Sequence, residues 1–183
     1  MALMHTPVCD FGLPAPDFKL QGVDGKQWSR NDCVGENGLL VMFICNHCPY
    51  VKSIQQRLVE DVAVLKKNGI GVVAIMSNDP NGYPDDSFVN MQKIAKEKYY
   101  NFPYLIDETQ QVAKAYGAIC TPDFFGYNAK MELQYRGRLD ESGMQEHVGD
   151  VKRDLLEAML LVAKTSNGPV EQVASMGCSI KWL

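Results

Sequence analysis

The 183-residue chain has 46% hydrophobic and 22% charged residues, which is enough to bury one core, and a net charge of −4 without a long basic run. These features exclude a typical nucleic-acid or anionic-membrane partner, and no apolar stretch approaches the roughly 18 residues of a membrane span. The first residues lack the basic and apolar regions of a signal peptide, so we expect a cytoplasmic protein.

The first half of the chain predicts a strand, a helix and a second strand after a short hairpin. Residues 1–15 read as an extended arm, and residues 16–28 as a β-hairpin that turns at Asp24-Gly25. Residues 38–44 form an uninterrupted apolar run, typical of a buried parallel strand. Apolar residues then recur at helical spacing over residues 49–67, and residues 70–76 predict a second buried strand.

The second half predicts an inserted helix, a short strand and a closing hairpin with a final helix. We expect helices over residues 87–98, 108–116 and 145–164, with Asp85 or Asp86 as the cap of the first. Residues 103–106 predict a short strand, and residues 123–127 and 132–135 an antiparallel hairpin. No repeat or linker interrupts the pattern, so we expect one domain over residues 16–183 after the arm of residues 1–15.

Cys45 and Cys48 form a Cys-x-x-Cys motif between the first buried strand and the helix that follows it. Two thiols at this spacing can close a disulfide, and a helix N-terminus stabilises a thiolate. We therefore expect dithiol–disulfide chemistry, with a lowered pKa at Cys45 and Cys48 as the more buried resolving thiol. The intervening His47, when protonated, is expected to lower the pKa of Cys45 further and make the pair more oxidising; the alternative is a solvated histidine that points away.

A second motif supports a family resemblance. The segment Cys120-Thr121-Pro122 precedes the predicted hairpin, where the thioredoxin fold carries a cis-proline against its redox cysteines. With the N-terminal hairpin and the inserted helix, the chain resembles the redoxins of the alkyl hydroperoxide reductase/thiol-specific antioxidant (AhpC/TSA) family. It is most similar to the subgroup that carries Cys-Asn-His-Cys-Pro-Tyr-Val-Lys, residues 45–52 here.

The resemblance implies an α/β thioredoxin fold, in three α/β/α layers around a mixed sheet, with an N-terminal β-hairpin extension and an inserted helix. It also implies a cis Thr121–Pro122 bond, and a substrate segment that pairs as an added strand beside Pro122. Two departures stand out. The first concerns peroxiredoxins: if Cys48 is aligned with their peroxidatic cysteine, Cys45 replaces the usual Thr/Ser and Val41 replaces the usual proline. The second concerns thioredoxin, whose buried acid near the strand before the cysteines has no counterpart in residues 39–44.

The expected catalytic residues are Cys45, Cys48, His47 and Pro122. The accessory candidates are Thr121, Cys120 as a third redox thiol, and Cys178 as a thiol that resolves a sulfenic acid or forms an accessory disulfide. Zinc held by Cys45, His47, Cys48 and Cys120 is the inorganic alternative. We expect no cofactor and no metal.

Three functions compete. The first is a thiol-disulfide oxidoreductase in which Cys45 attacks a disulfide and Cys48 resolves the mixed disulfide. The second is a peroxiredoxin-like thiol peroxidase, an antioxidant protein, and the third is a non-enzymatic thioredoxin-fold binding module. We expect an oxidoreductase whose partners are protein or small-molecule disulfides, with peroxides under the second reading, and a thiol reductant.

Overall fold

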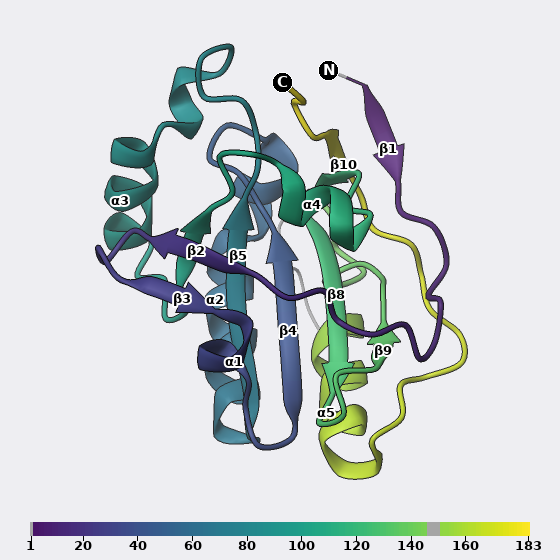
Figure 1. The fold of residues 1–183 in the computed structure, drawn as a ribbon. Helices are drawn as coiled ribbons and strands as arrows, with labels where there is room; N and C mark the ends of the chain where they lie inside the picture. The colour runs from purple at the N-terminus through teal and green to yellow at the C-terminus, as the bar shows by residue number, and fades with distance from the viewer. Residues whose placement is uncertain (1, 146–150) are drawn as a thin grey trace.

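A mixed β-sheet forms the centre of the computed structural model, which describes residues 2–145 and 151–183 (Figure 1). The strands β4 and β5 lie side by side, and the crossover helix α2 joins them; the Ile44 N–H donates to the Ile75 carbonyl at 3.1 Å. The strand β6 pairs parallel to β5, while β8 pairs antiparallel to both β4 and β9. The bounds are β4 (Gly38–Phe43), α2 (Pro49–Lys67), β5 (Ile70–Met76), β6 (Tyr104–Ile106), β8 (Asp123–Asn128) and β9 (Leu133–Tyr135).

Strand β4 is buried on both faces because its side chains alternate between two cores. Leu40 and Met42 belong to the core under α2 (with α3, Phe88–Glu97, and α5, Asp154–Thr165), while Leu39 and Val41 belong to the core on the opposite face. That second core is covered by α1 (Arg30–Cys33) and α4 (Gln111–Tyr116). The predicted three-layer α/β/α thioredoxin fold is confirmed.

The N-terminal extension is the predicted hairpin, made of β2 (Lys19–Gly22) and β3 (Gln27–Ser29). The strand β2 also pairs with β6, so the hairpin extends the central sheet. The inserted helix is α3, preceded by the short 3-10 helix η1 (Pro84–Asp86), and its N-cap is Ser87 rather than Asp85 or Asp86. The carboxylate of Asp86 turns toward the cysteines instead.

Two predicted helices begin later than their sequence patterns suggest. The helix expected over residues 108–116 begins at Gln111. The helix expected over residues 145–164 begins at Asp154, because Gln145 lies in a turn and residues 151–153 are irregular; residues 146–150 lie outside the described residues. The Asp154 carboxylate is held by Arg138 and Lys152 at this terminus.

The C-terminal tail forms a strand beside the predicted cis-proline. Here β10 (Met176–Ser179) pairs antiparallel with both β1 (Leu3–His5) and β7 (Cys120–Thr121), which joins the two ends of the chain (Figure 1). The arm therefore contributes a strand to a second, three-stranded sheet; the domain boundary near residue 16 stays a prediction.

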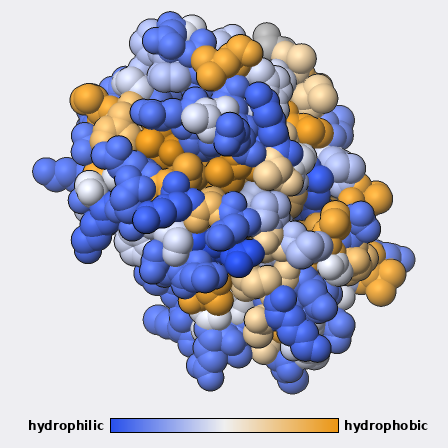
Figure 2. Space-filling view, in the orientation of Figure 1, coloured by the Kyte–Doolittle hydropathy of each residue, from blue (hydrophilic) through white to orange (hydrophobic). Residues whose placement is uncertain are grey.

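The surface is mixed in character. Hydrophobic residues lie in small groups among hydrophilic ones on the face that Figure 2 shows. Within residues 2–145 and 151–183, no helix is long and apolar enough to cross a membrane.

Candidate active site

The two motif cysteines lie at the C-terminal end of β4, and both are buried. Cys45 follows β4 in a loop, is 1% exposed, and has its Sγ atom 3.2 Å from the Thr121 hydroxyl. Cys48 is fully buried and is the N-cap residue of α2, which starts at Pro49. The helix N-terminus, and with it the positive end of the helix dipole, thus falls on Cys48.

The lowered pKa expected at Cys45 is wrong. The hydrogen bond with Cys48, burial and the negative charge of Asp86 raise the pKa of the Cys45 thiol well above its ordinary value. Interaction with Cys45 lowers the pKa of Cys48, and interaction with Cys178 lowers it further. Burial raises the pKa of Cys48 but is outweighed by these interactions. The Thr121 carbonyl lies 3.1 Å from the Cys48 Sγ and accepts a hydrogen bond when Cys48 is protonated. The resting thiolate is therefore favoured on Cys48.

This assignment predicts the pH behaviour of the reduced protein. Thiolate ultraviolet absorbance should persist well below the ~8.5 of a free cysteine. It should vanish in that range in Cys48→Ser, and it should shift to higher pH in Cys45→Ala, which removes a donor to the thiolate. Because the pKa of Cys48 is lower in the folded than in the unfolded state, the thiolate stabilises the native state fully above pH ~8.5. This contribution is lost as the pH falls toward the pKa of Cys48 in the folded state. Chemical denaturation of wild type and Cys48→Ser should show that difference, and identical pH profiles would contradict it.

Asp86 is the functional residue that the sequence analysis missed. It is fully buried, and one carboxylate oxygen accepts from the Asn46 N–H at 2.7 Å and the His47 N–H at 3.3 Å. The other oxygen accepts from the Asn78 amide at 2.8 Å. Asp86 thus fixes the backbone between the two cysteines and supplies the acid that the strand before them lacks.

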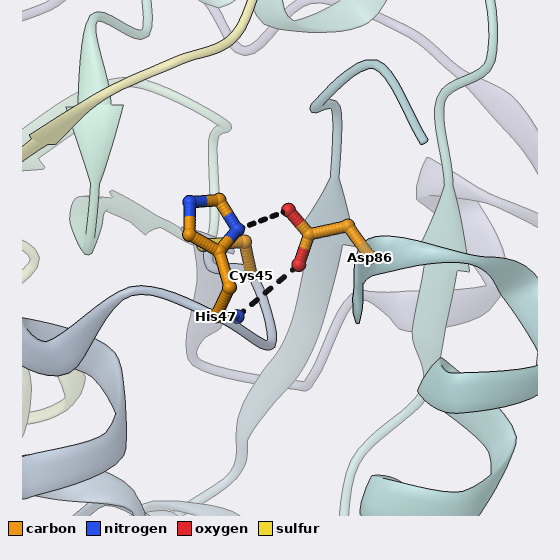
Figure 3. Close-up of side chains that lie close together, drawn as sticks. All are labelled: Cys45, His47 and Asp86. Carbon is orange, nitrogen blue, oxygen red and sulfur yellow. Dashed lines mark hydrogen bonds and ion pairs between the residues drawn. The ribbon is translucent and has the colours of Figure 1, made fainter. Parts of the chain in front are cut away.

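His47 points toward Asp86 rather than into solvent (Figure 3). Its Nδ1 lies 2.6 Å from the Asp86 carboxylate, and its ring stacks on Tyr83 with 4.9 Å between centroids. The alternative of a solvated histidine is therefore wrong. The Nε2 atom is buried and has no hydrogen-bond partner among the described residues.

Three groups of this site offer ligand atoms to a cation. Atoms of Cys45, His47 and Asp86 lie within 4.8 Å of one another, so Asp86 stands where the zinc alternative had Cys48 and Cys120. The imidazole and the carboxylate are already hydrogen-bonded to each other. A cation would therefore have to replace that bond.

The Thr121–Pro122 peptide bond is cis, as predicted, and β7 brings it to the cysteines. Thr121 contacts both thiols, Cys45 through its hydroxyl and Cys48 through its carbonyl. Cys120 is fully buried, and its thiol lies 3.5 Å from the Pro122 carbonyl; burial raises its pKa. Its surroundings are those of a packed thiol.

Cys178 is part of the thiol cluster, although it lies far along the chain in the tail. Its Sγ is 2.9 Å from the Cys48 Sγ, and its backbone is registered against Thr121 in the β10–β7 pair. The place beside Pro122 where a substrate segment was expected to add as a strand is thus filled on this side by β10. A cavity of about 370 Å³ opens beside Pro122, with Tyr50, Ile54 and Leu139 in its wall.

Residues 11–140 match the family model of the AhpC/TSA family. The chain belongs to the AhpC/TSA family. Among relatives of this AhpC/TSA protein, thiol-disulfide oxidoreductase ResA of Geobacillus thermodenitrificans is 25% identical over 143 residues, 77% of this chain and 78% of the relative. Peroxiredoxin Bcp of Escherichia coli K12 is 27% identical over 138 residues, 74% of this chain and 82% of the relative.

Two solved structures share the fold of this chain. An uncharacterized conserved protein from Geobacillus kaustophilus superposes with a TM-score of 0.94 at 41% identity, covering 100% of this chain and 97% of its own. The thioredoxin domain of a thiol-disulfide oxidoreductase from Bacteroides vulgatus gives a TM-score of 0.58 at 16% identity, covering 69% and 86% of the two chains. The second likeness shows the fold alone.

Proposed function

We propose that this protein is a thiol-disulfide oxidoreductase whose redox pair is Cys45 and Cys48. The observation that carries the proposal is the convergence of both thiols on Thr121, beside the cis-proline Pro122. The lowered pKa of Cys48 and its place at the N-terminus of α2 support a reactive thiolate. The relationship to ResA supports the same activity.

In this proposal Cys48 is the resting nucleophile, which reverses the roles expected from the sequence. The Cys48 thiolate attacks one sulfur of a disulfide substrate, that S–S bond breaks, and the departing sulfur leaves as a thiolate. Cys45 then attacks the Cys48 side of the mixed disulfide, which closes the Cys45–Cys48 disulfide and releases the second substrate thiol. The proton of Cys45 passes to a released thiolate, and a thiol reductant regenerates the pair.

His47 and Pro122 have positioning roles in this scheme. His47 pairs with the Asp86 carboxylate that holds the loop between the cysteines. Pro122 fixes the chain beside Thr121 and forms part of the cavity of about 370 Å³, to which we assign the substrate segment. The chain is long for a disulfide scaffold and its six cysteines are unevenly spaced, which supports a cytoplasmic site of action.

A thiol peroxidase is the second candidate, because two observations favour it. The thiolate is favoured on Cys48, the residue that aligns with a peroxidatic cysteine, and both thiols are almost completely buried, which admits a small oxidant more readily than a protein. Peroxiredoxin Bcp is among the relatives. Here Cys48 would become a sulfenic acid and Cys45 would condense with it, releasing water.

The two functions separate in paired assays on the same protein. We expect the dithiothreitol-reduced protein to reduce insulin disulfides or oxidised glutathione faster than it consumes hydrogen peroxide, since exchange needs only the pair described here. Cys9→Ser serves as the cysteine control, because Cys9 lies in the N-terminal arm. Rapid peroxide consumption without disulfide reduction would establish the peroxidase instead, and inactivity in both assays would favour a binding module.

A further inference from the structure

We propose that Cys178 is a third redox thiol of this site, which takes Cys48 out of the Cys45–Cys48 disulfide to form a Cys48–Cys178 disulfide. The inference deepens the proposed function and depends on it for the first disulfide. It gives the C-terminal strand β10 a chemical role, because β10 carries the accepting thiol.

The contact between Cys48 and Cys178 is close enough for a bond. Their sulfurs are 2.9 Å apart, so they need to approach by only about 0.9 Å to reach the ~2.05 Å of a disulfide. The Thr121 carbonyl, which contacts the Cys48 sulfur, belongs to the residue paired with Cys178 in the sheet. One backbone position thus holds both thiols.

The strand that carries Cys178 is held firmly against β7. Gly177 approaches so closely that a Cβ atom there would clash with the Thr121 carbonyl oxygen. On either side, the Ser175 hydroxyl donates to the Pro122 carbonyl at 2.9 Å, and the Ile180 N–H donates to the Ile119 carbonyl at 3.1 Å. Because this strand holds the Cys178 sulfur 2.9 Å from that of Cys48, Cys178 is placed to react with Cys48.

The exchange step balances without any outside reagent. The Cys178 thiolate attacks the Cys48 sulfur, the Cys45–Cys48 bond breaks as the Cys48–Cys178 bond forms, and Cys45 departs as a thiolate that takes up the proton given up by Cys178. No electrons leave the protein. The oxidising equivalent moves from the Cys45–Cys48 pair to Cys48–Cys178, and Cys45 becomes a free thiol again.

The charge on Cys48 controls when Cys178 can attack. In the reduced site, burial, the hydrogen bond to Cys48 and the negative charge of Cys48 raise the pKa of Cys178 to about 12, against the opposing effect of Lys181. Once Cys48 is in a disulfide, its negative charge is gone, and two of these three causes disappear. Cys178 therefore ionises more readily only when it has a disulfide to attack.

Disulfide mapping tests the step. The reduced protein is treated with graded, substoichiometric diamide, quenched in acid, alkylated and mapped by mass spectrometry, with Cys9→Ser as the matched control. We expect both Cys45–Cys48 and Cys48–Cys178 linkages in wild type and in Cys9→Ser, only Cys45–Cys48 in Cys178→Ser, and only Cys48–Cys178 in Cys45→Ser. Gly177→Ala should lower the Cys48–Cys178 share at least tenfold and keep Cys45–Cys48.

The outcomes separate this inference from the proposed function. The role of Cys178 would be overturned if wild type formed Cys45–Cys48 but no Cys48–Cys178, and Cys45→Ser also formed no Cys48–Cys178. The oxidoreductase proposal would then stay intact. Absence of Cys45–Cys48 even in Cys178→Ser would overturn the proposed pair, and with it the exchange.

Discussion

Replacing Cys48 with serine is expected to lower disulfide-reducing turnover by at least about a thousandfold, the scale expected for loss of a catalytic nucleophile. Cys48 is the thiol shared by both proposed disulfides, and its sulfur lies 2.9 Å from that of Cys178. Its removal eliminates the favoured thiolate and the common partner of both disulfides. Turnover of insulin or oxidised glutathione measures the loss.

Cys45→Ser is the matched comparison. It keeps the Cys48 thiolate, so it should still capture a disulfide substrate as a mixed disulfide, which non-reducing gel electrophoresis and mass spectrometry detect. Cys48→Ser should capture almost none. Trapping through Cys45 in the Cys48→Ser protein, with none in Cys45→Ser, would reverse this order and restore Cys45 as the attacking thiol.

Asp86→Ala is expected to lower the free energy of unfolding by about 3–5 kcal/mol, since it leaves several buried hydrogen-bond donors without their acceptor. The donors are the backbone N–H groups of Asn46 and His47 and the side chains of His47 and Asn78. The same change removes a negative charge that raises the pKa of Cys45, so that pKa should fall toward its ordinary value. Chemical denaturation and a pH–alkylation profile measure the two effects.

The neighbouring carboxylate provides the control for Asp86. Asp85 is exposed, and only its backbone carbonyl contacts the loop, at the Asn46 amide, so Asp85→Asn should change stability by less than ~0.5 kcal/mol. Asp86→Asn keeps one oxygen acceptor and should fall between the two variants. Equal stability of Asp85→Asn and Asp86→Ala would show that the buried carboxylate does not hold the loop.

The sequence could predict the central strands and α2 because each has a local signal. An apolar run marks β4 and helical spacing marks α2, while the cis Thr121–Pro122 bond was implied by the family resemblance. The predicted start of this helix at residue 49 also carries a consequence for the thiols: Pro49 is typical of the first helical position, which makes Cys48, and not Cys45, the N-cap residue.

The remaining parts of the site depend on long-range contacts. Asp86 lies in a turn-rich segment whose composition resembles a solvated loop, and only the docking of that segment buries it against Asn46 and His47. Cys178 has no neighbouring motif that shows which thiol it meets. Its partner is set by pairing of β10 with β7, which no local periodicity encodes.

The carboxylate of Asp86 lies 40 residues after Asn46, and Cys178 lies 130 residues after Cys48. During synthesis the two motif cysteines therefore emerge well before the groups that shape their loop and stabilise the thiolate. A nascent chain carries Cys45 and Cys48 as ordinary thiols until β5 and the segment behind it have docked. The tail completes the cluster last, so a chain that stops short of β10 lacks Cys178 and with it the finished thiol site.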